Sequence, residues 1–557
     1  MALTARLLAL IVISSAVFPC GGEPNGFRFV DTATQAGIHA QIVCGGPEKK
    51  WIPEANGSGV AWLDYDNDGW MDLLIVNGSS MERLRKIVLG GSPVFSGNGV
   101  YLYRNLGNGH FEDVTVKSGL SNPYWGTGAN AADYNNDGYT DILITTIGVD
   151  LLFRNNGDGT FAEVGKAAGL SRKLAWHTGS AFGDYDNDGN LDLYTVGYVD
   201  IQALLLTDPA ATCQYKGLPV FCGPMGLKGE RDILYHNNGD GTFGEVTQRA
   251  GVEDKGAFHG FAAVFEDFNG DGKVDLFVAN DSDPNYLYLN LGNGTFKESA
   301  VLSGVAFNLD GTIQANMGVA VGDYDNDGRV DLLTTTFEDA HFPFFGQDAS
   351  GFFEDISSRV GLGTTTEPYL GWGCGFADLD NDGKKDLWLA NGHIYPNIDQ
   401  VRGRYNQPFL VFGNQGGRFD RSYSFPVVPN NSYRGAAAGD YNNDGKVDIA
   451  VIPIVGSPVL LTNLTEKDHS WIGFALKGRR SNREVIGARM RIEACGNVQY
   501  ESVRNASSYI SRDDPRPRFG LGHCAKVSRA VITWPRGKVQ VLNDLSVNRY
   551  ISVDEPL

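Results

Sequence analysis

The stretch DYDNDGWMD, from Asp64 to Asp72, follows the pattern D-x-[DN]-x-D-G-x-x-D, which occurs seven times in the chain. The other copies are DYNNDGYTD at 133, DYDNDGNLD at 184, DFNGDGKVD at 267, DYDNDGRVD at 323, DLDNDGKKD at 378 and DYNNDGKVD at 440. Their starts lie 51 to 83 residues apart, which suits a four-stranded propeller blade with its loops better than a helical repeat. The sequence therefore predicts an all-β fold, a seven-bladed β-propeller, in which each copy forms what we call an Asp-rich loop.

A second repeated element lies between the Asp-rich loops. It reads YRNLGNGHFEDV at 103, FRNNGDGTFAEV at 153, YHNNGDGTFGEV at 235 and YLNLGNGTFKES at 288, and it is typical of a β-hairpin turn followed by a further strand. Only six Asp-rich loops are followed by this element. The stretch GFRFVDTATQAGI at 26 resembles its tail, so we expect the N-terminal strand to complete the last blade and to cover its open edge.

The Asp-rich loops carry oxygen ligands at fixed positions. Positions 1, 3, 5 and 9 are Asp or Asn, and the backbone carbonyl of position 7 can add a further oxygen ligand. Gly at position 6 permits the sharp turn of the loop. Such a set of oxygen ligands suits a hard cation such as Ca²⁺. An EF-hand requires Glu at position 12, where this chain has strand-forming residues such as Ile75 and Val278. We therefore predict about seven structural Ca²⁺ ions, which would change the formal charge from −20 to −6.

The predicted calcium ligands occupy positions 1, 3, 5 and 9 of the seven loops. They are Asp64, Asp66, Asp68 and Asp72; Asp133, Asn135, Asp137 and Asp141; Asp184, Asp186, Asp188 and Asp192; Asp267, Asn269, Asp271 and Asp275; Asp323, Asp325, Asp327 and Asp331; Asp378, Asp380, Asp382 and Asp386; and Asp440, Asn442, Asp444 and Asp448.

Composition and charge exclude several classes of protein. The chain has 557 residues, of which 42% are hydrophobic and 20% are charged, so it is a folded protein with room for more than one domain. Its 66 Asp and Glu residues against 46 Lys and Arg residues argue against nucleic acid as a partner.

The N-terminal residues predict export. The one long apolar run, from Leu7 to Phe18, spans 12 residues, whereas a membrane-spanning helix needs about 20. The run follows Arg6 and predicts a signal peptide over residues 1–20, and hence a secreted, periplasmic or cell-surface protein with no membrane span. Lipid modification of Cys20 is the alternative, which Pro19 disfavours.

Removal of Cys20 leaves six cysteines, an even number that suits disulfide bonds in an exported chain. Sequence proximity favours two pairs, Cys213 with Cys222 and Cys495 with Cys524. The alternative is that the thiols are free and buried.

The repeat pattern ends after Asn463. The stretches HSWIGFALKG at 469, NREVIGARMRI at 482, RFGLG at 518 and VITWPRGKVQ at 531 resemble the ASPIC/UnbV domain, and the Asp-rich loops resemble the FG-GAP/VCBS repeats of integrin α-subunits. Together they resemble the layout of the cartilage acidic protein family, with a propeller over residues 26–465 and an ASPIC/UnbV-like domain over residues 466–557. The resemblance implies secretion and calcium dependence.

The junction between the two predicted domains is short. Only about seven residues separate the strand VLLTN at 459 from the strand predicted at 471, and they include no Gly, Pro or Ser-rich tether. We therefore expect the C-terminal domain to pack against the propeller.

A candidate ligand site lies six to eight residues before the Asp-rich loops, where the innermost strands begin. The expected residues at this mouth of the channel are Asn56, Trp125, Trp176, His177, His259, Asn316, Trp372 and Arg434, with Glu54 and His393-Ile394-Tyr395 nearby. Aromatic and histidine side chains suit a sugar, a peptide or a further metal. The alternative is that they pack the ring without a ligand. The segment from Cys213 to Cys222 lies outside the repeat and is either a functional loop or a cap on the channel.

The function expected from these residues is binding. No H-E-x-x-H, G-x-S-x-G or Walker motif occurs, so we predict a non-enzymatic binding or adhesion module for an extracellular glycan or protein. The alternative is a secreted enzyme that acts on a glycan or another small substrate through His177, His259 or His393. The candidate ligand-binding residues are Trp125, Trp176, His177, His259, Trp372, His393 and Arg434.

Overall fold

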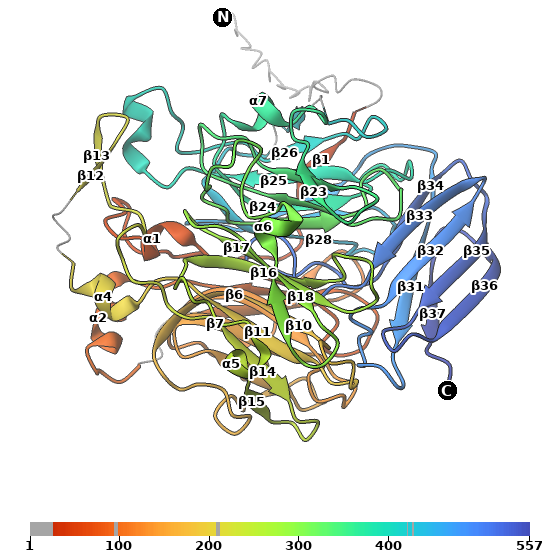
Figure 1. Cartoon of the computed structure of the whole chain (residues 1–557), viewed down its shortest axis with the longest axis horizontal. Coiled ribbons are helices and arrows are strands. Elements are labelled where there is room, and N and C mark those ends of the chain that lie inside the picture. The colour runs from red at the N-terminus through yellow and green to blue at the C-terminus, as the bar shows by residue number, and fades with distance from the viewer. Residues whose placement is uncertain (1–25, 94–98, 208–211, 420–421, 426–427) are drawn as a thin grey trace, which may run out of the picture.

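The computed structural model describes residues 26–93, 99–207, 212–419, 422–425 and 428–557. The predicted signal peptide and Cys20 lie outside these residues. Within the described ranges, no helix is both long and apolar enough to cross a membrane. The predicted all-β class is confirmed, because strands dominate and the helices are short (Figure 1).

Each Asp-rich loop joins the first and second strands of an antiparallel unit of four strands. Four units are separate sheets with their strands in chain order: β2 (Val60–Leu63), β3 (Asp72–Val76), β4 (Val100–Asn105) and β5 (Phe111–Asp113); β16 (Gly260–Glu266), β17 (Asp275–Asn280), β18 (Tyr286–Asn290) and β19 (Phe296–Glu298); β20 (Val319–Gly322), β21 (Asp331–Thr334), β22 (Phe344–Gln347) and β23 (Phe353–Asp355); and β24 (Gly371–Ala377), β25 (Asp386–Asn391), β26 (Leu410–Phe412) and β27 (Ser422–Ser424).

Two further units are joined into one eight-stranded sheet, because Trp176 pairs with Ile147 at the start of its strand. These units are β6 (Trp125–Ala132), β7 (Asp141–Gly148), β8 (Leu151–Asn155) and β9 (Phe161–Glu163); and β10 (Ala175–Gly183), β11 (Asp192–Gly197), β14 (Ile233–Asn237) and β15 (Phe243–Glu245).

The remaining unit combines the two ends of the repeat region. It contains β28 (Tyr433–Gly439), β29 (Asp448–Pro453), β30 (Val459–Asn463) and, as its fourth strand, β1 (Phe29–Asp31). β1 runs antiparallel to β30, with Phe29 opposite Asn463. The prediction that the N-terminal strand completes the last unit is confirmed.

The residue at the end of the third strand joins each unit to the one before it. Its backbone N–H donates to the position 9 carboxylate of its own loop, at 2.7–3.2 Å. Its side-chain amide donates to the backbone carbonyl of position 2 in the preceding unit. The seven residues are Asn105, Asn155, Asn237, Asn290, Gln347, Asn414 and Asn463.

These hydrogen bonds form a closed cycle, because Asn105 of the first unit donates to Tyr441 of the last. Apolar clusters follow the same cycle, one between each pair of consecutive units. Between the first and last units, the rings of Trp62 and Tyr441 stack with centroids 6.3 Å apart. We call the seven bonded units the ring.

The helices are short and lie in the connections between strands. They are α1 (Pro53–Asn56), α2 (Met81–Val88), α3 (Thr115–Ser118), α4 (Ile201–Leu205), α5 (Thr247–Ala250), α6 (Ala300–Ser303), α7 (Gly363–Thr366) and the 3₁₀ helix η1 (Pro396–Gln400). Gly119, Gly251 and Gly304 end α3, α5 and α6 in the left-handed conformation, which glycine adopts without a steric penalty. α1, α2, α4 and the hairpin of β12 (Cys213–Tyr215) and β13 (Leu218–Val220) lie on the left in Figure 1.

The C-terminal strands lie on the opposite side of the ring (Figure 1). One sheet contains β34 (Arg518–Gly522), β31 (Ser470–Lys477) and β37 (Arg549–Asp554), and the other contains β33 (Asn497–Ser502), β32 (Arg489–Ala494), β35 (Lys526–Thr533) and β36 (Val539–Ser546). Their apolar faces form one core around Phe474, Ile492 and Trp534.

Both predicted disulfides are present. Cys213 is bonded to Cys222, and Cys495 is bonded to Cys524. Cys44 is a free, buried thiol, and so is Cys374.

The connection between β33 and β34 enters the ring. We call residues 505–514 the plug, because they contact the first strand of every unit. The contacts are Val60 N–H to Ser511 Oγ, Ala129 N–H to the Ile510 carbonyl, Phe182 N–H to Asn505 Oδ1, the Phe261 ring to the Tyr509 ring, Val319 N–H to the Ser508 carbonyl, Cys374 N–H to Ser508 Oγ and Ala438 N–H to Asp513 Oδ1. The expectation that the C-terminal domain packs against the ring is confirmed, and the insertion of the plug is an additional feature.

Tyr509 lies at the centre of these contacts. Its side chain is fully buried, its hydroxyl donates to the Asn56 carbonyl at 2.9 Å, and its ring meets those of Trp372 and Phe261 at 4.8 and 5.5 Å. The plug is therefore part of the core of the ring.

We predict that Tyr509→Ala lowers the free energy of unfolding by about 3 kcal/mol or more, because it leaves a cavity in this core. Tyr509→Phe keeps the ring contacts and loses one hydrogen bond, so it should cost only about 1 kcal/mol. Urea denaturation measures both variants. Equal stabilities for the Ala variant and the unmodified chain would show that the plug does not support the ring.

Candidate metal centres

The backbone of each Asp-rich loop forms a tight cradle. Positions 4 and 6 adopt left-handed φ angles, as in Asn67 (58°) and Gly69 (87°), which Asn and Gly tolerate best. In all seven loops the N–H of position 5 donates to Oδ1 of the position 1 Asp, at 3.0–3.1 Å. The N–H of position 6 donates to Oδ2 of the same Asp. The loop therefore fixes the first carboxylate before any ion binds.

The carboxylates of positions 1, 3 and 9 converge. In the four loops with Asp at position 3, one oxygen from each of these residues lies within 4.8 Å of the other two, as in Asp64, Asp66 and Asp72. The other three loops have Asn at position 3. Position 9 begins the second strand of each unit and is buried in every loop. In these four loops, three of the four predicted ligand side chains are therefore brought together.

Protein cations lie beside several of these carboxylates. Position 7 is Lys or Arg in four loops, and in three of them it pairs with the Asp at position 5, as in Lys273 with Asp271 at 2.6 Å. Arg104 pairs with Asp66 at 2.6 Å, and His236 Nδ1 lies 3.1 Å from Asp192 Oδ1. These contacts only partly balance the negative charge of the loops.

Two oxygens of the predicted calcium ligands lack any hydrogen bond in the part of the chain that the structure describes. They are Oδ1 of Asp66, at position 3, and Oδ2 of Asp448, at position 9, and both atoms are buried. A buried carboxylate oxygen without a partner is costly. Together with the all-oxygen donor set, these atoms fit a hard divalent cation.

Burial raises the pKa of the loop carboxyls. Loss of hydration, reinforced by neighbouring carboxylates, raises the pKa of Asp64 to about 6, of Asp133 to about 7 and of Asp141 to about 9. The pKa of Asp331 rises to about 8 for the same reasons. Without a cation, these carboxyls therefore keep their protons to a higher pH than exposed carboxyls do.

The C-terminal domain covers the ends of several loops. Arg516 donates to the carbonyl of Asp440, and the Tyr550 hydroxyl donates to Asp440 Oδ2 at 2.8 Å. Arg518 donates to the carbonyl of Asp378, and Arg489 forms an ion pair with Asp267. These contacts attach the C-terminal domain to the candidate metal centres.

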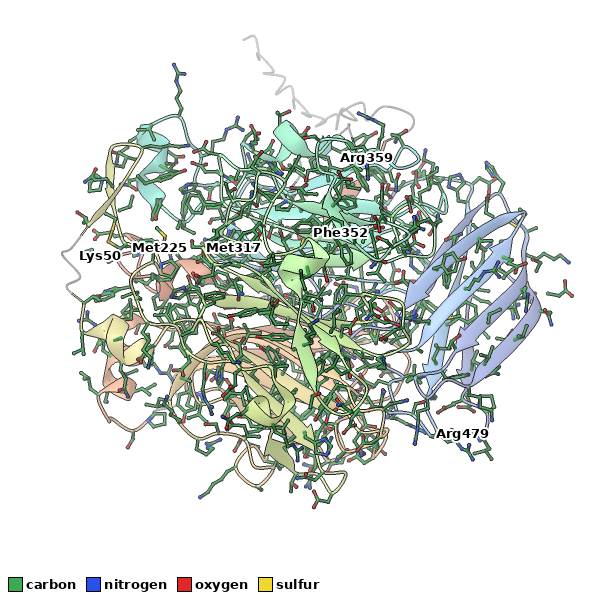
Figure 2. The ribbon with its side chains drawn as sticks, in the orientation of Figure 1. Lys50, Met225, Met317, Phe352, Arg359 and Arg479 are labelled. Atoms are coloured by element: carbon green, nitrogen blue, oxygen red, sulfur yellow. A yellow bond between two sulfur atoms is a disulfide. The ribbon has the colours of Figure 1, made fainter. Side chains whose placement is uncertain are left out.

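The sequence-predicted ligand residues lie at the other end of the ring, where they are buried. Trp125, Trp176 and Trp372 are at most 2% exposed and share one apolar cluster with Tyr509 of the plug. In Figure 2, Lys50 and Met225 mark this end of the ring, and Arg479 marks the opposite end, beside the C-terminal strands. The mouth is thus packed with side chains, and contact of these residues with a ligand remains a prediction.

The polar residues predicted at this mouth are also held by the protein. The fully buried guanidinium of Arg434 lies 4.1 Å from the centre of the Trp372 ring and donates to the Ala55 carbonyl. His177 Nδ1 lies 2.5 Å from Asp150 Oδ2. Three further polar members of the set are positioned in the same way: His259 Nδ1 lies 2.8 Å from Asp283, the Asn316 amide donates to Asn285, and Glu54 accepts bonds from the N–H groups of Gly46, Lys50 and Trp51. The buried Nδ2 of Asn56 has no hydrogen bond within the described ranges.

Sequence reasoning missed residues that surround His393. Its Nε2 lies 3.3 Å from Glu338 Oε1, and Glu338 accepts a hydrogen bond from the Tyr215 hydroxyl and pairs with Lys216 at 2.8 Å. Lys216 and Tyr215 belong to the hairpin closed by Cys213 and Cys222, whose position outside the repeat was the available signal. No local pattern marked Glu338.

We predict that the protein in excess EGTA becomes less stable as the pH rises from 5 to 8. The folded chain has raised Asp pKa values, whereas the ordinary value is 3.8. The folded state therefore holds protons that the unfolded chain has lost. Each such Asp lowers the free energy of unfolding by about 1.4 kcal/mol per pH unit until the pH reaches its own raised pKa, about 7 for Asp133 and about 9 for Asp141. Thermal denaturation at a series of pH values measures it. A melting temperature that rises from pH 5 to pH 8 in EGTA would contradict this account of the loops.

Two protein families match parts of the chain. FG-GAP-like repeats match residues 87–144, 133–195 and 267–334, and ASPIC and UnbV matches residues 478–557. A solved lectin of Agrocybe aegerita, described as recognising non-reducing terminal N-acetylglucosamine, has a TM-score of 0.38 and 17% identity, with 72% of this chain and 86% of that chain covered.

Curated relatives align with most of the chain. Cartilage acidic protein 1 of Homo sapiens is 25% identical over 508 residues, which cover 87% of this chain and 61% of that protein. Cartilage acidic protein 1 of Xenopus tropicalis is 22% identical over 528 residues, which cover 86% of this chain and 70% of that protein. This chain therefore spans only part of the length of the relatives it matches. It is an FG-GAP-repeat protein with a C-terminal ASPIC and UnbV domain, homologous over most of its length to cartilage acidic protein 1.

Proposed function

We propose that the chain is a secreted, calcium-binding, seven-bladed β-propeller that acts as a binding or adhesion module for an extracellular glycan or protein. The observation that carries the proposal is the convergence of carboxylates in the Asp-rich loops. Their buried oxygens without hydrogen bonds match the demand of Ca²⁺ for many oxygen ligands. Positions 1, 3, 5 and 9 and the carbonyl of position 7 would hold the ion.

The propeller part of the proposal rests on the closed cycle of contacts. Seven amide side chains and seven apolar clusters link consecutive units, including the first and the last. Closure of this kind leaves no free edge between the ends of the repeat region. Calcium in each loop would neutralise carboxylates that otherwise repel one another beside these contacts.

The secretion part of the proposal rests on the cysteines and on the N-terminal apolar run. Two disulfides are present, and disulfides persist mainly in oxidising compartments. Homology to cartilage acidic protein 1 accords with an extracellular setting.

A binding role is favoured over catalysis by the packing at the ring mouth. His177 and His259 are buried, and each is held against a carboxylate. A general base must reach the atom that it deprotonates, and these rings face protein instead. The proposal therefore assigns no reaction to the chain.

The calcium proposal predicts a split effect of Asp141→Asn. In excess EGTA this variant should lose little stability, because removal of a buried carboxyl whose pKa burial raises offsets the loss of one of the two backbone hydrogen bonds that Asp141 accepts, from Tyr134 and Asn155. In saturating Ca²⁺ it should be less stable, because one bound ion contributes about 2.7 kcal/mol at a hundredfold excess over its Kd. Differential scanning calorimetry in both buffers measures the melting temperatures.

The control for this experiment is Asp158→Asn, an exposed Asp in the hairpin turn of the same unit, whose carboxylate bonds only to Thr160 in the described chain. It should respond to calcium as the unmodified chain does. A melting temperature of the unmodified chain that is the same in EGTA and in Ca²⁺ would refute the calcium proposal.

The binding proposal is tested on arrays of glycans and extracellular proteins with the purified calcium-loaded chain. We expect retained binding to at least one class and no chemical change of the bound ligand. Release of a product by the unmodified chain, abolished in His259→Ala, would instead establish the enzymatic alternative.

A further inference from the structure

Segments outside the repeat gather at the end of the ring that lies away from the C-terminal domain. They are the disulfide-closed hairpin, residues 335–341 after β21 and residues 392–407 after β25. The Asn397 amide donates to the Pro219 carbonyl at 3.0 Å. Four rings, those of Tyr215, Phe337, His393 and Tyr395, contact one another with centroids 5.4–6.4 Å apart. Three units thus contribute to one rigid group of loops.

These segments border a cavity of about 420 Å³. Its polar wall includes Lys216, Glu338, Asp339, Glu367, Arg402 and Arg404, and Tyr369 adds an aromatic ring. The cavity lies outside the predicted set of ligand residues, although His393 adjoins it through Glu338. Loops held by a rigid scaffold are frequent sites of recognition.

Part of the negative charge in this cavity is paired with Lys216. Lys216 lies 2.8 Å from both Glu338 and Asp339. Hydrogen bonds with His393, Lys216 and Tyr215 outweigh the effect of burial and lower the pKa of Glu338 to about 2. Glu338 is therefore an anion fixed by its neighbours, and it holds the hairpin in place.

The two arginines of this cavity have no ion-pair partner in the described part of the chain. The guanidinium groups of Arg402 and Arg404 make no ion pair or hydrogen bond with any residue in the described ranges. Both arginines are exposed and border the same cavity, in a chain whose formal charge is −20. Arginine is suited to carboxylate and sulfate because its N–H groups form paired hydrogen bonds with them.

Two residues that border this cavity have strained backbone conformations. Lys216 and Asp339 are non-glycine residues with left-handed φ angles of 48° and 68°, and they face each other across the 2.8 Å ion pair. Such residues cluster at binding sites, where the surrounding structure holds them.

We propose that this cavity binds an acidic saccharide, with Arg402 and Arg404 holding its carboxylate or sulfate. Asp339 and Glu367 would accept hydrogen bonds from sugar hydroxyls, and Tyr369 would provide an aromatic surface for a sugar ring. This inference rests on the proposed binding function and names its site and ligand class.

The test uses calorimetric titration of the calcium-loaded full chain with three matched probes: 3′-sialyllactose, lactose 3′-sulfate and neutral lactose. We expect at least one charged probe to bind tenfold or more tightly than lactose, with an affinity that falls as NaCl is raised. The double variant R402A/R404A should lose at least tenfold in affinity for that probe. R402K/R404K should restore part of it, because charge remains and the paired geometry does not.

The matched control is Arg359→Ala, an exposed arginine at the outer edge of the ring (Figure 2), whose ion pair with Glu354 lies in solvent. It should bind the charged probe as the unmodified chain does. Equal binding of all three sugars, full binding by R402A/R404A, or binding of poly-aspartate but of no sugar would overturn the inference. Failure of the calcium-dependent stabilisation would instead count against the proposed function, so the two failures are distinguishable.

Discussion

The amide side chain at the end of each third strand is the contact on which the ring depends. Asn155 shows the arrangement: its N–H binds Asp141 of its own loop at 2.8 Å, and its side chain reaches the Tyr65 carbonyl of the preceding unit at the same distance. Asp141 therefore serves two purposes, as a candidate metal ligand and as the acceptor that orients the amide. The geometry of the loop and the contact between the units therefore depend on the same buried carboxylate.

Charge sets the second constraint. Carboxylates converge in four of the Asp-rich loops, and burial raises the pKa of residues such as Asp331 to about 8, so ionisation of the ion-free loops costs free energy at neutral pH. Tyr550 and Arg489 of the C-terminal domain bind Asp440 and Asp267 in these loops. The same domain fills the ring with residues 505–514. The attachment of the C-terminal domain to the ring is consequently linked to the charge state of the loops.

Local patterns predicted the loops, the hairpins and the strand that closes the last unit, because each depends on residues close in sequence or on a repeated motif. They also placed Trp125 and Trp372 at a common end of the ring. They did not show that these residues are buried, because the covering groups come from the plug and from inserts outside the repeat. The role of Asn105 and its equivalents was also missed, since the same Asn-Gly pattern is typical of a turn.

The central claim is that every Asp-rich loop holds one calcium ion. Native mass spectrometry of the full chain, after exchange into buffer with Ca²⁺ and then into buffer with EGTA, tests it most directly. The account predicts a mass difference of seven calcium ions between the two states, together with a broader charge distribution in EGTA as the loops loosen. Equal masses in the two buffers, with no calcium retained, would contradict it.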